Sequence, residues 1–133
     1  MGPNDAQIAQ VEQHFGVRFP QDYREFLATT GSLSQFVPPA DDFLAIDPLA
    51  ELIGINEAGE FQKRFPSAVV IGGDGSRELL AYDFRQDVPP LVTFDVSAEN
   101  WSDAIHQAPS LSTFLEQFPR TGWNWGDSDS QNN

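Results

Sequence analysis

The side chains that most often carry chemistry are few and far apart in this sequence. The chain has two histidines, His14 and His106, and no cysteine. No acid or serine stands at a recognisable catalytic spacing from His106, and two isolated imidazoles do not make a zinc site. The lack of cysteine excludes a thiol nucleophile, thiolate metal ligands and a disulfide framework. We therefore expect structural roles for both histidines, with no catalytic residues, no metal and no cofactor.

A glycine-rich stretch at residues 72–76, Gly-Gly-Asp-Gly-Ser, is the one segment that suggests phosphate binding. It lacks the lysine of a P-loop, and it lies between two apolar runs typical of strands. No helix N-terminus therefore follows it to bind an anion. Asp-Gly is a turn dipeptide, because glycine adopts positive φ without a Cβ clash. The stretch is predicted to be a hairpin turn.

Carboxylates are the abundant chemical groups. The chain has 20 Asp and Glu against 7 Lys and Arg, a net charge of −13. Binding to nucleic acid or to an anionic membrane is not expected, because both need clustered basic residues. A cationic partner is favoured instead. An acid-pair hydrolase stays a minor alternative, since nothing selects one catalytic pair from the twenty acids.

The negative charge is concentrated in two blocks. Residues 36–62 hold six acids and no Lys or Arg, and residues 83–103 hold five acids against Arg85. A solvated surface explains any single acid, but a block of uncompensated charge costs stability through self-repulsion. A cationic partner would relieve that repulsion. The predicted partner-binding residues are Asp41, Asp42, Asp47, Glu57, Glu60, Asp83 and Asp87.

The length of 133 residues and the apolar content of 40% suit one domain with a core of its own. No apolar run approaches the ~18 residues of a membrane span. The first residues have neither the basic nor the apolar region of a secretory signal. We expect a cytoplasmic protein with one domain over residues 1–119. Residues 120–133 are expected to form a polar, disordered tail.

Three helices are predicted. The first follows Asn4 and ends at Gly16, because apolar residues recur at spacings of three and four between them. The second begins after Pro20 and ends at residues 30–31, Thr-Gly. The last runs from residues 109–110, Pro-Ser, to Pro119. Shorter helical turns are expected at residues 49–53, interrupted by Gly54, and at residues 57–64.

Strands are predicted at residues 43–46, 68–73, 77–83 and 91–96. The last of these alternates apolar and polar residues, as a half-buried antiparallel strand does. Residues 32–42 are expected to be loop and residues 97–107 helical or irregular. Strands joined by short turns are antiparallel, and the helices lie towards the two ends of the chain. The expected fold class is α+β, with a central, mostly antiparallel sheet and helices packed on it.

Three segments, taken in order, resemble landmarks of the SMI1/KNR4 proteins of the SUKH superfamily. The first is a helix, a glycine, an apolar residue and Phe-Pro, followed by Tyr, Phe-Leu and Thr-Gly; Phe19 stands for the usual leucine and Thr30 for the usual asparagine. The second is a strand, a Gly-Asp-Gly turn and a strand that ends in an aromatic residue and Asp. The third is the last helix, with its Phe-Leu pair. Together they cover residues 8–118.

The resemblance implies an α+β fold and no catalytic activity. Bacterial members are mostly immunity proteins, which bind a toxin domain, often a nuclease, in the cell that makes it. Fungal members regulate cell-wall synthesis and signalling. We therefore expect a monomeric immunity protein with a cationic cognate toxin. A regulatory scaffold that binds several cellular proteins is the alternative.

The physics of a nuclease agrees with this expectation. A nuclease presents a basic groove to hold phosphate. An acidic inhibitor is steered to such a groove, with on-rates up to ~10⁹ M⁻¹s⁻¹ at low salt. Tryptophans are common anchors of such interfaces. Trp101 is predicted to lie in the core, whereas Trp123 and Trp125 are expected either to fold back onto the domain or to be exposed.

Overall fold

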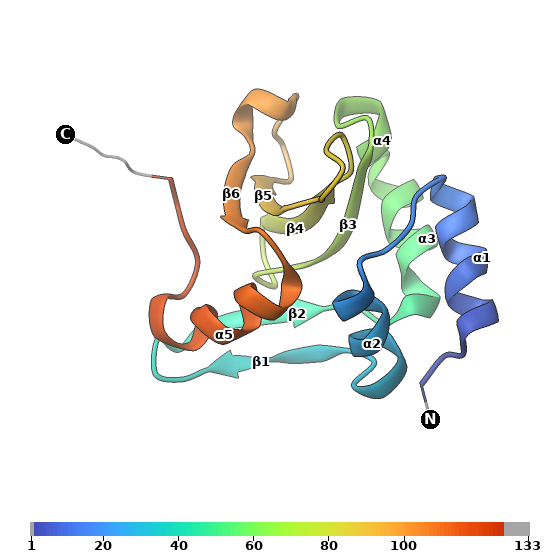
Figure 1. Ribbon diagram of the computed structural model, residues 1–133. Coiled ribbons are helices and arrows are strands. Elements are labelled where there is room, and N and C mark those ends of the chain that lie inside the picture. Colours follow the sequence, from blue (N-terminus) through green and yellow to red (C-terminus); the bar gives the residue numbers. More distant parts are fainter. Residues whose placement is uncertain (1, 127–133) are drawn as a thin grey trace.

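The structure is a computed structural model, and it describes residues 2–126 (Figure 1). One antiparallel sheet forms its centre, and strands adjacent in the chain are adjacent in the sheet. The expectation for a disordered tail falls largely on residues 127–133, which lie outside the described part. The strands are β1 Leu33–Val37, β2 Asp42–Ile46, β3 Ala68–Gly73, β4 Glu78–Asp83, β5 Leu91–Asp95 and β6 Ile105–Ala108.

The helices enter the chain before, within and after the sheet. Helices α1 and α2 precede it, α3 and α4 connect β2 to β3, and α5 follows β6. A short 3₁₀ turn lies between β5 and β6. The fold is α+β, as predicted. The bounds are α1 Asp5–Phe15, α2 Gln21–Thr29, α3 Leu49–Gly59, α4 Phe61–Arg64, η1 Trp101–Asp103 and α5 Leu111–Thr121.

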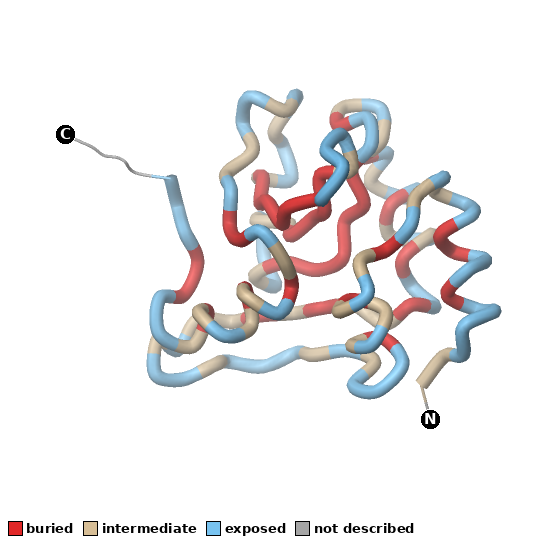
Figure 2. Tube along the Cα trace, viewed as in Figure 1, coloured by how far each residue is buried: buried red, intermediate tan, exposed pale blue. Residues whose placement is uncertain are grey.

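The sheet has a hydrophobic core on each face. Side chains of α1, α2, α3 and α5, including Tyr23 and Phe114, fill the larger core. Phe61 of α4 and Phe65, which directly follows that helix, contribute to the smaller one, where the Phe65 ring stacks on Phe94 at 3.9 Å. Strand β5 is therefore buried on both faces, and Thr93 is buried too. The expectation of a half-buried strand was wrong, because β5 contributes side chains to both cores. Figure 2 shows the strand in the buried colour.

Helix α1 begins and ends as its sequence predicts. Asn4 and Gln7 form a capping box, in which each side chain accepts from the other's backbone N–H at 2.9 Å. Such a box satisfies N–H groups that the first turn leaves without partners. Gly16, at φ 70°, takes the left-handed conformation that ends the helix. Helix α2 likewise starts directly after Pro20.

Residues 33–37 form strand β1, where a loop was expected. All five pair in register with β2. Their central three side chains are exposed, so the strand lacks the apolar alternation that would have identified it. Residues 105–108 form β6, where a helical or irregular segment was expected. His106 on this strand is exposed, and the pairing with β5 shifts register near it.

Two helices are longer than predicted. Helix α3 continues through Gly54, because Leu52 and Asn56 lie buried on one face across it and offset the ~1 kcal/mol helix cost of glycine. It ends at Gly59, and Glu60, at φ 53°, separates it from α4. Helix α5 continues through Pro119 to Thr121. A proline so near the end removes only one of the final backbone hydrogen bonds.

Strands β2 and β3 pair over a short length only. Their register covers Ala45 with Gly73 and Ile46 with Gly72. Further along β3 the side chain of buried Asn56 replaces the missing strand: its Oδ1 accepts from the backbone N–H of Val70, and its Nδ2 donates to the Val70 carbonyl, both at 2.9 Å. Gln62 Nε2 donates to the carbonyl of Ala68 at 2.7 Å. Two amide side chains thus complete the edge of β3 beyond the C-terminal end of β2.

We predict that Asn56→Ala destabilises the protein by about 2–4 kcal/mol, because the N–H and C=O of Val70 would be left buried without partners. Urea unfolding followed by circular dichroism measures the change. Gln13→Ala, at an exposed position of α1, is the control and should change stability by less than about 0.5 kcal/mol. Equal stability of the two variants would contradict the role assigned to Asn56.

Candidate functional site

The acids predicted to bind a partner do not form one patch. One group flanks the hairpin of β1 and β2. A second lies at the C-terminal end of α3, and a third lies in or beside the connection from β4 to β5. In that order the groups are Asp41, Asp42 and Asp47; Glu57 and Glu60; and Asp83 and Asp87.

Asp83 is occupied inside the protein. The residue is 2% exposed, and its carboxylate accepts from Nε and Nη2 of Arg85, both at 2.9 Å. Burial alone would raise the pKa of Asp83, but hydrogen bonds from Arg85 and Gln86 outweigh it and lower that pKa. The Arg85 guanidinium lies 3.9 Å from the ring centre of Trp101, a cation–π contact. By holding the Arg85 side chain against Trp101, Asp83 therefore connects the start of the β4–β5 connection to the segment before β6.

Acidification tests this role of Asp83. A carboxylate whose folded-state pKa is lowered stabilises fully above its unfolded pKa of about 3.9, and that stabilisation is lost as the pH falls through the folded-state value. Asp83→Asn is expected to cost about 1–3 kcal/mol at pH 7 and clearly less near pH 3. Urea midpoints at both pH values measure it, with exposed Asp87→Asn as the control. A gap of the same size at both pH values would contradict the assignment.

Asp42 holds the segment that follows α5. Its Oδ2 accepts from the backbone N–H of Trp123 at 3.0 Å, and the indole Nε1 of Trp123 donates to the carbonyl of Phe43 at 3.0 Å. The Trp123 ring also packs on Phe114 and Phe118. Trp123 is thus folded back and 6% exposed, whereas Trp125 is 57% exposed. Of the two predicted alternatives, Trp123 therefore follows the first, folding back onto the domain, and Trp125 follows the second, exposure to solvent.

Trp101 contributes to the smaller core, as predicted. It is partly buried, and its ring meets Phe65 edge-on at 5.5 Å. Its indole N–H donates to the carbonyl of Pro66 at 3.1 Å.

The remaining predicted acids are more accessible. Glu57 lies 3.3 Å from the imidazole of His14, and Glu60 pairs with Lys63 at 3.3 Å. Among residues 2–126, Asp41, Asp47 and Asp87 form no ion pair. Asp87 lines a surface hollow of about 390 Å³ together with Arg18 and Pro109. The pKa of Asp47 is raised by partial burial and by nearby Glu51.

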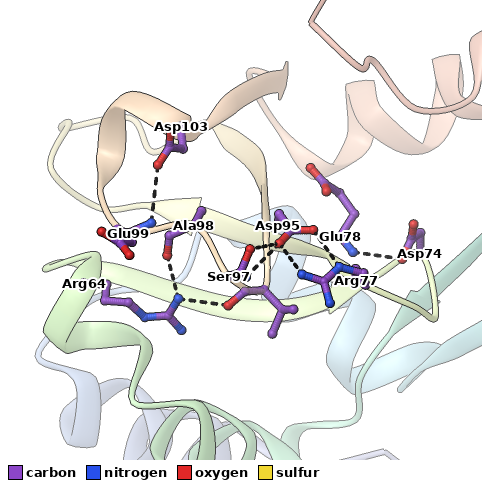
Figure 3. A network of polar contacts seen from close by, with 10 residues as sticks. Arg64, Asp74, Arg77, Glu78, Asp95, Ser97, Ala98, Glu99 and Asp103 are labelled. Atoms are coloured by element: carbon purple, nitrogen blue, oxygen red, sulfur yellow. Dashed lines mark hydrogen bonds and ion pairs between the residues drawn. The ribbon is translucent and has the colours of Figure 1, made fainter.

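A further acidic cluster, not singled out in the sequence, lies where the β3–β4 turn meets the end of β5 (Figure 3). Glu78 stands opposite Asp95 in the register, with Asp74 in the adjoining turn. Burial, then Asp95 and Asp74, raise the pKa of Glu78. Hydrogen bonds from Ser97, then Arg77, lower the pKa of Asp95 to about 2.

The loop beside this cluster is held by Arg64. Its Nη1 donates to the carbonyls of Val96 at 2.9 Å and Ala98 at 2.6 Å. Glu99 donates its backbone N–H to Asp103 at 3.3 Å.

Strand register could have revealed the acidic cluster of Glu78, Asp95 and Asp74, because the antiparallel pairing of residues 77–83 with 91–96 brings their acids close together.

We predict that Glu78→Gln stabilises the protein at pH 7 by up to ~1 kcal/mol, allowing for solvent screening. A raised folded-state pKa means that the ionised carboxylate disfavours the fold, and this penalty disappears as the pH falls through that pKa. Asp95→Asn should have the opposite sign, since it removes a carboxylate that Ser97 and Arg77 stabilise. Thermal melts at pH 7 and pH 4 test both. Destabilisation by Glu78→Gln at pH 7 would contradict the assignment.

Residues 2–126 contain no group of three or more His, Asp or Glu suited to hold a metal ion. The side chain of Asp74 accepts from the backbone N–H groups of Ser76 and Glu78, so the glycine-rich stretch is the predicted hairpin turn. A hollow of about 540 Å³ between α1 and the start of α3 is lined by no ionisable side chain. Of the described helices, none has the length and apolar character to cross a membrane.

Sequence comparison agrees with this fold. The SMI1 / KNR4 family (SUKH-1) matches residues 2–117, and the chain belongs to that family. A relative in Bacillus subtilis (strain 168), described as "Uncharacterized protein YnaB", is 29% identical over 110 residues, which cover 74% of this chain and 73% of the relative. The predicted family is therefore confirmed.

Proposed function

We propose that this chain is a non-catalytic binding module, an immunity protein that neutralises a cognate basic toxin domain in the bacterium that makes it. The observation that carries the proposal is a SMI1/KNR4 chain with a net charge of −13. Family membership supports a binding role, and the charge supports a cationic partner. A nuclease fits this description, because its groove must be basic to hold phosphate.

The placement of the acids supports surface recognition. The two predicted groups at the hairpin and at the end of α3 are accessible, and the cluster around Glu78 adds a third acidic surface. Asp83 and the Oδ2 of Asp42 already have internal partners. We therefore propose Asp41, Asp47, Glu57, Glu60 and Asp87 as the acids able to contact a partner, in a monomer acting in the cytoplasm.

An affinity experiment tests the proposal. The full chain is immobilised and exposed at low salt to lysate of its source organism, and bound proteins are eluted with rising salt and identified by mass spectrometry. Recovery of one basic domain that is toxic when expressed alone and harmless with this chain would support the immunity function. Recovery of many cellular proteins without such a domain would favour the alternative, a regulatory scaffold.

Salt dependence and charge neutralisation sharpen the test. We expect the association rate with the recovered domain to fall about tenfold between low and physiological-to-high ionic strength, because steering by exposed charges is screened. Neutralising Asp41, Glu57 and Glu60 to their amides should slow association further than the charge-matched control with Asp5, Glu25 and Glu116 neutralised. Surface plasmon resonance measures both. A rate that is flat with salt and equal for the two variants would contradict an electrostatic interface.

A further inference from the structure

Strand β1 is the free edge of the sheet. It runs along the border of the molecule, no helix or strand of residues 2–126 lies beyond it, and its middle is exposed (Figures 1 and 2). The opposite edge, β6, is covered: the carbonyls of His106 and Gln107 accept hydrogen bonds from the side chains of Asn124 and Gln117, both at 2.9 Å. The protein thus protects one edge of the sheet and leaves the other open.

The open edge lacks the usual protection against strand addition. Proteins guard such edges with charged side chains, prolines or bulges. The five residues of β1, Leu-Ser-Gln-Phe-Val, include no charge and no proline, and their pairing with β2 has no register shift. Every second residue of an edge strand turns its N–H and C=O away from its neighbour. Among residues 2–126, Ser34, Gln35 and Phe36 form no hydrogen bond other than those to β2.

An aromatic ledge, formed by Phe36 and Phe43, lies beside this edge. Phe36 is 62% exposed, and its ring meets that of Phe43 at 5.2 Å. Gly75 makes room for the ledge, since a Cβ there would lie 2.7 Å from the Phe43 ring. An exposed Phe36 ring, supported by the partly buried Phe43, lies next to backbone groups that face away from β2. It offers an incoming strand both an apolar anchor and hydrogen bonds.

Carboxylates stand at both ends of the edge. Asp41 lies in the hairpin turn, and Asp42, whose Oδ2 accepts from the N–H of Trp123, begins β2 opposite Val37. Asp47 follows β2 at the other end, beyond the pair Leu33 and Ile46. Five strand residues separate the two ends by ~17 Å. None of these three acids forms an ion pair among the described residues. The edge is therefore uncharged in its centre and negative at its ends.

This charge pattern selects the occupant. An antiparallel second copy would bring Asp41 of one chain near Asp47 of the other, and each chain carries −13. A strand with an uncharged centre and basic flanks meets opposite charge at both ends. We propose that β1 is the docking edge for an extended, basically flanked segment of the partner protein, added as a seventh strand. This docking proposal rests on the proposed function, because the segment that adds to β1 belongs to the cationic partner proposed there.

A synthetic peptide tests the edge without the toxin. The probe has two lysines at each end and five alternating threonines and valines between them. It is titrated into the ¹⁵N-labelled full chain, and amide shifts and hydrogen exchange are followed. We expect shift changes and slowed exchange at residues 33–37. A copy methylated on alternate backbone nitrogens, and a copy with glutamate in place of lysine, should each bind at least about tenfold more weakly.

Two variants of the protein distinguish specific binding at the aromatic ledge from non-specific hydrophobic binding. Phe36→Ser should weaken peptide binding severalfold, whereas Val88→Ser, at an apolar residue that is 77% exposed in the connection from β4 to β5, should not. Circular dichroism confirms that both variants fold. Binding that ignores backbone methylation, or shifts confined to other elements, would overturn the proposal. So would concentration-dependent dimerisation through β1 in the absence of peptide, because the second copy would then be the occupant.

The two proposals fail separately. A basic toxin domain that binds and is neutralised while the amides of β1 stay unprotected would overturn the docking edge and leave the immunity function standing. Peptide binding at β1 with no basic toxin in the affinity experiment would support the edge and count against the immunity function.

Discussion

The fold depends on the hydrogen bonds by which Asn56 satisfies both backbone groups of Val70. A sheet strand that loses its neighbour leaves buried N–H and C=O groups, which cost about 1–3 kcal/mol each when unpaired. Here α3 and α4 supply side-chain amides instead of a strand. Strand β2 can therefore end at Ile46 after two registered pairs with β3, and the chain continues into α3. The hairpin of β1 and β2 extends away from the rest of the sheet, and its outer strand has no neighbour.

Local signals in the sequence were sufficient for much of this architecture. Asn4 and Gly16 mark the ends of α1, and the Asp-Gly turn with its apolar flanks marks β3 and β4. Strands β1 and β6 were missed, because exposed strands carry no apolar alternation and are defined by their partners. Gly54 suggested a helix end that burial on the helix face overrode. Pro119 suggested another, but it lies so near the end of α5 that it removes only one backbone hydrogen bond. Propensity is a weak prior wherever packing decides.

The candidate site was harder to predict than the fold. Charge density along the chain grouped acids that lie on separate elements, and two of them, Asp42 and Asp83, have partners inside the protein. Nothing in the sequence shows that Arg85 folds back onto Asp83. The opposition of Glu78 and Asp95 depends on register, and a shift of one residue would pair Glu78 with Val96 instead. Such distinctions need the loop lengths and the tertiary contacts themselves.

Asp42 joins two parts of the chain that are made at different times. Its carboxylate binds the backbone of Trp123, 81 residues further on, and the tip of the hairpin receives its last hydrogen bond when Ala40 donates to Pro119. Contacts of such long sequence separation form late. During synthesis on the ribosome, the hairpin therefore waits for the C-terminal helix before its tip is secured. Until then the growing chain exposes unpaired strand edges, which are the features of an incomplete fold that promote aggregation and are recognised by chaperones.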